Sequence, residues 1–183
     1  MSQQFNDIWF TFKARIAAEL RLKNNDVHSQ ILLIWYAIAS SIVAIVSLKY
    51  KDPLGQDTDL YTTILSVALL SLSLLVATRD YRGRALSMRS NHITLKLLYD
   101  DLMAGNLTPA EKPKLYSKLL LECENHSSYD DRYFRLFAQT TRPLSIQEFF
   151  IVFFQIAARW LFIATLYFSP IALIIIKLHQ KGA

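Results

Sequence analysis

The chain has 183 residues, of which 52% are apolar or aromatic, 19% are charged and only four are glycine. Average usage would give about thirteen glycines, so the composition argues against a turn-rich β-protein and against a nucleotide enzyme built on a glycine loop. The mean hydropathy is +0.22, and 20 Lys and Arg residues stand against 15 Asp and Glu. Charged residues must therefore be separated from long apolar runs, and the length allows one domain.

Residues 1–30 predict an amphipathic helix. Its apolar side chains recur at helical spacing, namely Phe5, Trp9, Phe12, Ile16 and Leu20. Such a helix either packs on a helical bundle or lies on a membrane surface.

Two transmembrane helices are predicted next. Residues 31–48 and 60–78 contain no charged residue, and each run is close to the ~20 residues that cross a membrane as a helix. The connection, residues 49–59, contains Pro53 and Gly55, which are typical of a short turn. We therefore expect two antiparallel helices, a transmembrane hairpin.

A third apolar run occupies residues 149–176 and is interrupted by Gln155, Arg159 and Pro170. An arginine is costly in the middle of a membrane. The run predicts either a third span or a helix that is re-entrant or lies at the interface.

Basic residues predict the orientation. They gather before the first span and after the second, at Lys13, Arg15, Arg21, Lys23, Arg79, Arg82, Arg84, Arg89 and Lys96. The hairpin loop holds only two lysines. The positive-inside rule then places the N-terminus and the central region in the cytoplasm.

Residues 79–148 predict three helices outside the membrane, of which the first continues the second span without a break. A four-three spacing of mostly apolar residues predicts a coiled-coil-like seam able to join copies of the chain, at Tyr81, Ala85, Met88, His92, Leu95, Tyr99 and Leu102. Gly105 is expected to end this helix.

Capping signals predict the next helices. Thr108, Pro109 and Glu111 predict a second helix that reaches about Asn125. The third carries Tyr129, Tyr133, Phe134 and Phe137. Ser145 and Glu148 form a capping-box pattern before the last apolar run.

No catalytic residue, metal site or cofactor is expected. The four histidines are scattered, and Cys123 with His126 would need two further metal ligands. The pairs Asp100/Asp101 and Asp130/Asp131 are interpreted as solvated charges at helix ends. A membrane-bound enzyme would need Cys123, His126 or the paired aspartates to converge.

Polar residues form one face of each of the first two predicted spans. They are Tyr36, Ser40 and Ser47 in the first, and Thr62, Ser66 and Ser73 in the second. Small and hydroxyl side chains favour close helix packing, and in an oligomer they can line an aqueous path. Both interpretations require helices to associate.

Arg82, Arg89 and Lys96 follow each other along one side of the predicted seam, and we call them the basic stripe. Such residues either face water and acidic neighbours or bind an anion, which can be a lipid headgroup, a nucleotide or nucleic acid.

The chain resembles the SLATT proteins, two-transmembrane effector domains found with bacterial nucleotide-signal synthetases. The resemblance is carried by the hairpin, the segment TRDYRGRA at residues 78–85 and the segment YSKLLLECENHSSYDDRY at residues 116–133. ENHSxxD, at residues 124–130, is similar to the subgroup encoded beside reverse transcriptases. On this resemblance, residues 1–183 are expected to form a single SLATT-like domain. Its parts are the N-terminal amphipathic helix (1–30), the transmembrane hairpin (31–78), the central helices (79–148) and the C-terminal apolar helix (149–176).

The resemblance implies an all-α membrane effector of prokaryotic antiviral defence. It is expected to form a homo-oligomer that permeabilises the inner membrane, and arrests or kills the cell, when a reverse transcriptase or nucleotide-signal synthetase partner sends a nucleotide or DNA signal. The alternative is a scaffold without a pore that recruits a soluble partner through its helices outside the membrane.

Overall fold

The computed structural model describes residues 3–50, 53–108, 110–138 and 140–182. Within these ranges the chain is helical and contains no strand, as predicted. The helices are α1 (Gln3–Lys49), α2 (Thr58–Arg79), α3 (Tyr81–Met103), α4 (Lys112–Leu121), α5 (Ser128–Phe137) and α6 (Ile146–Gly182). Pro109 and the side chain of Phe5, which the sequence analysis named, lie outside the described part.

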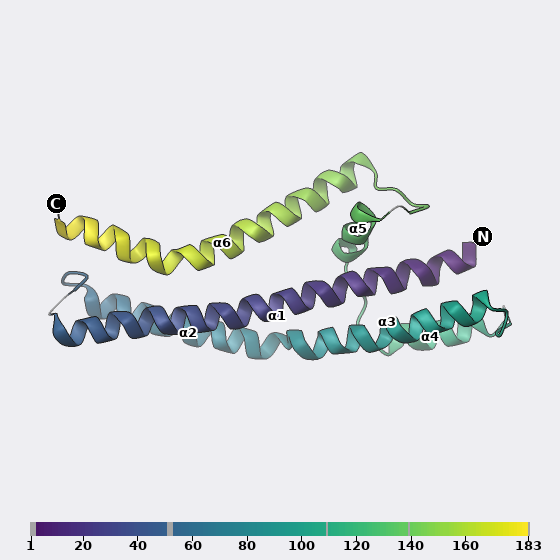
Figure 1. Ribbon diagram of the computed structural model, residues 1–183, viewed down its shortest axis with the longest axis horizontal. Coiled ribbons are helices and arrows are strands. Elements are labelled where there is room, and N and C mark those ends of the chain that lie inside the picture. Colours follow the sequence, from purple (N-terminus) through teal and green to yellow (C-terminus); the bar gives the residue numbers. More distant parts are fainter. Residues whose placement is uncertain (1–2, 51–52, 109, 139, 183) are drawn as a thin grey trace. The chain divides into compact units, whose positions relative to one another are not determined.

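The chain divides into two compact units. The bundle unit comprises Met1–Asn25 and Tyr81–Ile156, and the apolar unit comprises Asp26–Asp80 and Ala157–Ala183. Figure 1 shows α1 as one unbroken ribbon, so the amphipathic segment and the first span belong to a single helix. Both α1 and α6 contribute residues to each unit.

The apolar unit contains stretches of α1, α2 and α6 that are long and apolar enough to cross a membrane. Many of their aliphatic side chains are exposed, for example Ile34, Ile45, Leu70 and Leu161. A contiguous apolar surface of this kind is costly in water but suits lipid. The prediction of an all-α membrane protein is confirmed. α6 is a third candidate span, and its helix continues through Pro170.

The hairpin turn follows from Gly55. Its φ of +91° lies in the left-handed region, which glycine enters without steric cost. The Thr58 hydroxyl donates to the Gly55 carbonyl over 2.7 Å and accepts from the Leu54 amide over 3.1 Å. These bonds close the turn between α1 and α2, in the place that the sequence predicts.

The expectation of an unbroken helix through the second span and beyond is wrong at Asp80. This residue has φ 41° and ψ 50°, a left-handed conformation that aspartate tolerates better than most residues do. The single residue ends α2 at Arg79 and lets α3 begin at Tyr81.

The core of the bundle unit forms around the first part of α1. Ile8 and Phe12 pack with Leu95, Leu98 and Leu102 of α3 and with Leu119 of α4. Farther along α1, Ala18 and Leu22 pack with Ala85 and Met88. The amphipathic segment thus packs on the bundle, which is one of its two predicted placements.

The bounds of one of the shorter helices, α4, differ from the prediction. α4 begins at Lys112 rather than near Thr108 and ends at Leu121 rather than near Asn125. The predicted capping pair still forms, because the Glu111 carboxylate accepts from the amide and the hydroxyl of Thr108. A second predicted capping box is confirmed at the start of α6, where Ser145 and Glu148 bond reciprocally.

Candidate functional site

One polar cluster of the bundle unit surrounds Arg15 of α1, which is fully buried. Its guanidinium donates to the Asn91 side chain and to the carbonyls of Leu119 and Leu120. Asn91 also donates to the Leu119 carbonyl over 2.7 Å. These carbonyls belong to the last turn of α4, where backbone acceptors lack helical partners and carry partial negative charge. Arg15 and Asn91 therefore cap α4. Burial lowers the pKa of Arg15, although nearby Cys123 and Tyr116 act in the opposite direction.

Glu19 follows on the same helix and is 6% exposed. Its carboxylate lies 2.7 Å from Nε2 of His92 and 2.6 Å from Nζ of Lys23. Burial raises the pKa of Glu19, but the hydrogen bonds and charges of Lys23 and His92 outweigh it, so the net pKa is lowered. The predicted seam residue His92 thus joins α3 to α1 within one chain.

Arg21 and Asp130 tie α1 to α5. Asp130 is fully buried, and its two oxygens accept from Nε and Nη2 of Arg21 over 2.7 and 3.0 Å. Asp130 also accepts from the amide and hydroxyl of Ser127, and its own amide donates to the Ser127 hydroxyl, so the two form the capping box of α5. We call Arg21, Ser127 and Asp130 the α5 clamp. The interpretation of Asp130 as a solvated charge is wrong, whereas Asp100 and Asp101 are exposed as expected.

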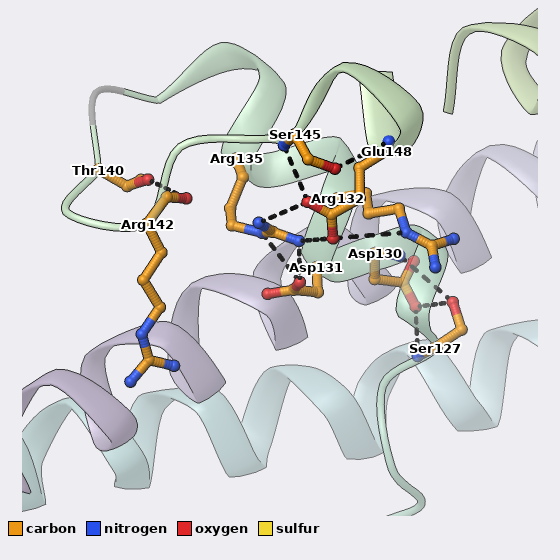
Figure 2. Close-up of polar contacts among 9 residues, drawn as sticks. All are labelled: Ser127, Asp130, Asp131, Arg132, Arg135, Thr140, Arg142, Ser145 and Glu148. Carbon is orange, nitrogen blue, oxygen red and sulfur yellow. Dashed lines mark hydrogen bonds and ion pairs between the residues drawn. The ribbon is translucent and has the colours of Figure 1, made fainter. Parts of the chain in front are cut away.

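A second ion cluster joins α5 to α6. Figure 2 shows Arg135 between Asp131 and Glu148, with salt-bridge distances of 2.9 and 2.7 Å. Glu148 also accepts from the Ser145 amide. Hydrogen bonds from Arg135 and Ser145 lower the pKa of Glu148 to about 2.

The Arg135–Glu148 contact predicts an acid-sensitive junction. Because the pKa of Glu148 is lower when folded, the contact stabilises α6 fully above the ordinary pKa of about 4.5 and is lost as the pH falls toward about 2. The protection of the amides at the start of α6, taken as the exchange rate relative to the intrinsic rate at each pH, should therefore fall between pH 4.5 and 2. E148Q removes the titrating carboxylate and should abolish the part of this fall in protection that depends on it. An unchanged pH profile in E148Q would contradict the assignment.

A polar cavity of about 340 Å³ lies in the bundle unit. α1 contributes Asp7, Phe10 and Thr11 to its lining, and the later helices and loops contribute Tyr116, His126, Asp131 and Arg142. The hydroxyls of Thr11 and Tyr116 are 2.7 Å apart. Burial and the charge of Arg15 lower the pKa of His126.

The cavity brings together part of the set that an enzyme would need, because His126 and Asp131 both line it. Cys123 is not in the lining and instead contacts Ser87 and Met88. Among the described residues, no group of three or more His, Cys, Asp or Glu side chains is placed to hold a metal ion.

The basic stripe lies exposed on α3. Lys96 forms a 2.5 Å salt bridge with Asp100, whereas Arg82 and Arg89 show no polar partner within the described ranges. None of the three lines the cavity. That the stripe binds an anion stays a prediction.

The seven seam residues are buried or half-buried within a single chain. The buried members, Ala85, Met88, Leu95 and Leu102, pack on α1. That the seam joins copies of the chain stays a prediction, and such a contact would require α1 to move away from α3.

The polar residues of the spans differ in their contacts. Tyr36 is 9% exposed; its hydroxyl lies 2.7 Å from Oγ of Ser169 and donates to the Leu166 carbonyl on α6 over 3.2 Å. Ser47, Thr62 and Ser66 bond to carbonyls of their own helices. Ser40 is half-buried and Ser73 is exposed. Tyr36 thus serves packing within the apolar unit, and the serines and threonine remain candidates for contacts between copies.

Y36F should lower the stability of the apolar unit by about 1 kcal/mol, because hydrogen bonds inside membranes contribute about 0.6 kcal/mol each. Thermal unfolding of the full chain in detergent measures the effect. Y50F is the matched control, since Tyr50 is 57% exposed. Equal stability of Y36F and the wild type would mean that the Tyr36 hydroxyl does not hold α6.

The sequence analysis did not predict the polar partners of Arg15, Glu19 and Arg21. It counted the two arginines as orientation signals and did not consider Glu19. The spacing of Ser127 and Asp130, a Ser-x-x-Asp pattern ahead of an aromatic run, was a signal for the capping box. No local pattern indicates the partners on other helices.

Residues 2–176 match a protein family described as SMODS and SLOG-associating 2TM effector domain family 5. No curated protein and no solved structure shows a significant match to the chain. The family description counts two transmembrane helices, whereas the described residues contain three candidate spans.

Proposed function

Because the chain belongs to the SMODS and SLOG-associating 2TM effector domain family, it is a membrane effector domain of defence systems, and we propose that it makes the membrane permeable on a partner's signal. In this proposal copies of the chain associate in the bacterial inner membrane, with the bundle unit in the cytoplasm. The signal comes from a nucleotide-signal synthetase or reverse transcriptase, and growth arrest or cell death follows.

One observation carries the proposal: the same helices serve both units. α1 contributes to the bundle core through Ile8 and Phe12 and continues into the first candidate span, and α6 likewise contributes to both units. A change in the packing of the bundle unit therefore acts on residues covalently continuous with the spans. The exposed apolar side chains and outward hydroxyls of the apolar unit supply surfaces through which spans of several copies can associate.

In this proposal, hydrogen bonds and ion pairs of the bundle unit maintain the closed state. Arg15 and Asn91 hold α4, the α5 clamp holds α5, and Arg135 holds the start of α6. Signal binding shifts the population only if the signal has higher affinity for the open arrangement than for the closed one. The basic stripe is exposed and lies on α3, which follows the second span directly, and we assign it contact with the signal or with the partner.

Dye entry into cells tests the proposal. The full chain is expressed with and without the synthetase or reverse transcriptase encoded beside its gene, and uptake of a membrane-impermeant DNA dye is measured over time. Uptake is expected only when both proteins are present and the partner is active. Co-expression that leaves the membrane intact while the chain is membrane-inserted would contradict the proposal.

The alternative, a scaffold without a pore, is favoured by one surface. Leu86, Ile93 and Leu97 are each about half exposed on α3 and share one side of that helix, next to the basic stripe. An acidic amphipathic helix of a soluble partner would fit such a surface. Partner recruitment to the membrane without dye entry would support the scaffold.

A further inference from the structure

The start of α6, residues 146–156, carries an exposed apolar surface within the bundle unit. We call it the aromatic face, and it comprises Ile146, Phe149, Phe150, Phe153 and Phe154. Its side chains are contiguous, because the ring centre of Phe149 lies 5.8 Å from that of Phe150 and 6.4 Å from that of Phe153. A contiguous apolar surface is costly in water and marks a site of contact with a protein or a membrane.

A hollow of about 580 Å³ continues the aromatic face. Phe149 belongs to both, and the other apolar lining side chains come from the end of α5 and the loop before α6, namely Leu136, Ala138, Pro143 and Leu144. The polar side chains of the lining, Arg135, Thr140 and Thr141, are bonded to other groups of the chain. The hollow therefore offers apolar surface to an occupant and suits a hydrocarbon chain.

Charge does not prevent this segment from meeting lipid. Glu148 is the single charged residue of 146–156, and Figure 2 shows its carboxylate beside Arg135, at 2.7 Å. Gln147 and Gln155 are uncharged, and the remaining residues are apolar. Charged side chains at membrane depth are costly and are found paired, and the Arg135–Glu148 pair meets that requirement.

The length of α6 places the segment at the edge of a span. The apolar stretch Ile146–Ile176 has 31 residues, which makes about 46 Å of helix, whereas the hydrocarbon core is about 30 Å thick. The part of this stretch in the apolar unit, residues 157–176, already has the ~20 residues that cross the core. Residues 146–156 continue it in one helix, so they are held within a few turns of the lipid headgroups.

The exposed surface of this segment extends around more of the helix than one protein partner would cover. Val152 is fully buried and forms the side that packs within the bundle unit. Ile151 is exposed as well and lies nearly opposite Phe149 around the helix. A helix that packs on a protein needs an apolar stripe of about 100°, whereas lipid covers every side, and phenylalanine is typical of helices at the membrane interface.

We propose that the aromatic face and the hollow lie against the bilayer and are covered by phospholipid acyl chains. The bundle unit then has a lipid contact of its own, in addition to the spans. This inference requires a membrane protein and does not depend on whether the chain makes the membrane permeable.

Spin labels on single cysteines test the proposal in the full chain, reconstituted in vesicles of phosphatidylcholine and phosphatidylglycerol. The native Cys123 is first removed with C123A. F150C then reports on the aromatic face, where Phe150 is 63% exposed. L121C is the matched control, since Leu121 is 88% exposed and also belongs to the bundle unit, and L161C reports on a candidate span. Surface substitutions of this kind have small effects on folding, and circular dichroism checks it.

Oxygen partitions into lipid and a water-soluble nickel complex does not, so the ratio of their effects on each label measures contact with lipid. The ratio at residue 150 is expected to be several-fold higher than at residue 121 and close to that at residue 161. A ratio at residue 150 equal to that at residue 121 would show that the aromatic face meets water. Low access of both reagents, with dipolar broadening between labels of two copies, would show that a second copy covers it. Either result would overturn the proposal.

A photoactivatable phosphatidylcholine, with its reactive group on the acyl chain, tests the hollow in the wild-type chain. Cross-links are expected on residues 143–150 as well as on the spans, and not on the segment around Leu121. Labelled spans without a cross-link on residues 143–150 would contradict the proposal.

Discussion

Replacing Asp130 by alanine is expected to lower the free energy of unfolding of the bundle unit by about 3–5 kcal/mol. The substitution leaves Arg21, which is 24% exposed, without its two hydrogen-bond acceptors, and breaking a buried ion pair on one side costs about that much. It also removes one half of the α5 capping box, and loss of such a cap costs about 1 kcal/mol on its own. D130A should therefore detach α5 from α1.

Hydrogen exchange of the α5 amides measures this loss directly, because exchange reports local opening. D100A is the matched control, since the Asp100 side chain is half exposed and paired with Lys96, and surface pairs contribute about 0–1 kcal/mol. R21A and the double variant complete a cycle that isolates the pair. Protection of α5 in D130A equal to that in D100A would show that the α5 clamp does not hold the helix.

Reversing the basic stripe with R82E, R89E and K96E is expected to reduce partner-dependent dye entry to below a tenth of the wild-type level. Three reversals change the local charge by six units, so an anionic signal or acidic partner is repelled where it was attracted. All three residues are exposed, and surface substitutions of this kind have small effects on stability. The expected loss is therefore in triggering and not in folding.

K114E with K118E is the matched control, because these lysines are exposed on α4 and lie outside the stripe. The control should keep dye entry and binding of the partner. Wild-type dye entry in the stripe variant, with partner binding unchanged, would remove the stripe from the triggering mechanism.

Features that depend on local sequence could be predicted. The first two spans were predicted from uncharged runs of residues. The hairpin turn was predicted from Gly55, and the cap of α6 was predicted from Ser145 and Glu148. The burial of Ala85, Met88, Leu95 and Leu102 follows from their helical period. The helical spacing does not show which helix covers these residues. The face that resembles a seam between copies is covered by α1 of the same chain.

Features that depend on contacts between distant residues could not be predicted. Arg21 and Asp130 are 109 positions apart, and Arg15 lies 104 positions before Leu119. Charge counting placed Arg15 and Arg21 among orientation signals, although one caps α4 and the other anchors α5. Asp80 was missed for another reason: a single residue in a left-handed conformation separates α2 from α3, although the apolar run and the four-three spacing on its two sides each predict a helix.

The conductance of planar lipid bilayers that contain the purified full chain tests the central claim most directly. The synthetase or reverse transcriptase encoded beside the gene is first incubated with nucleoside triphosphates, and its products are added on the side of the bundle unit. Discrete conductance steps are predicted with the products and not with the triphosphates alone. Inserted protein that stays silent with the products, or conducts equally without them, would contradict the account.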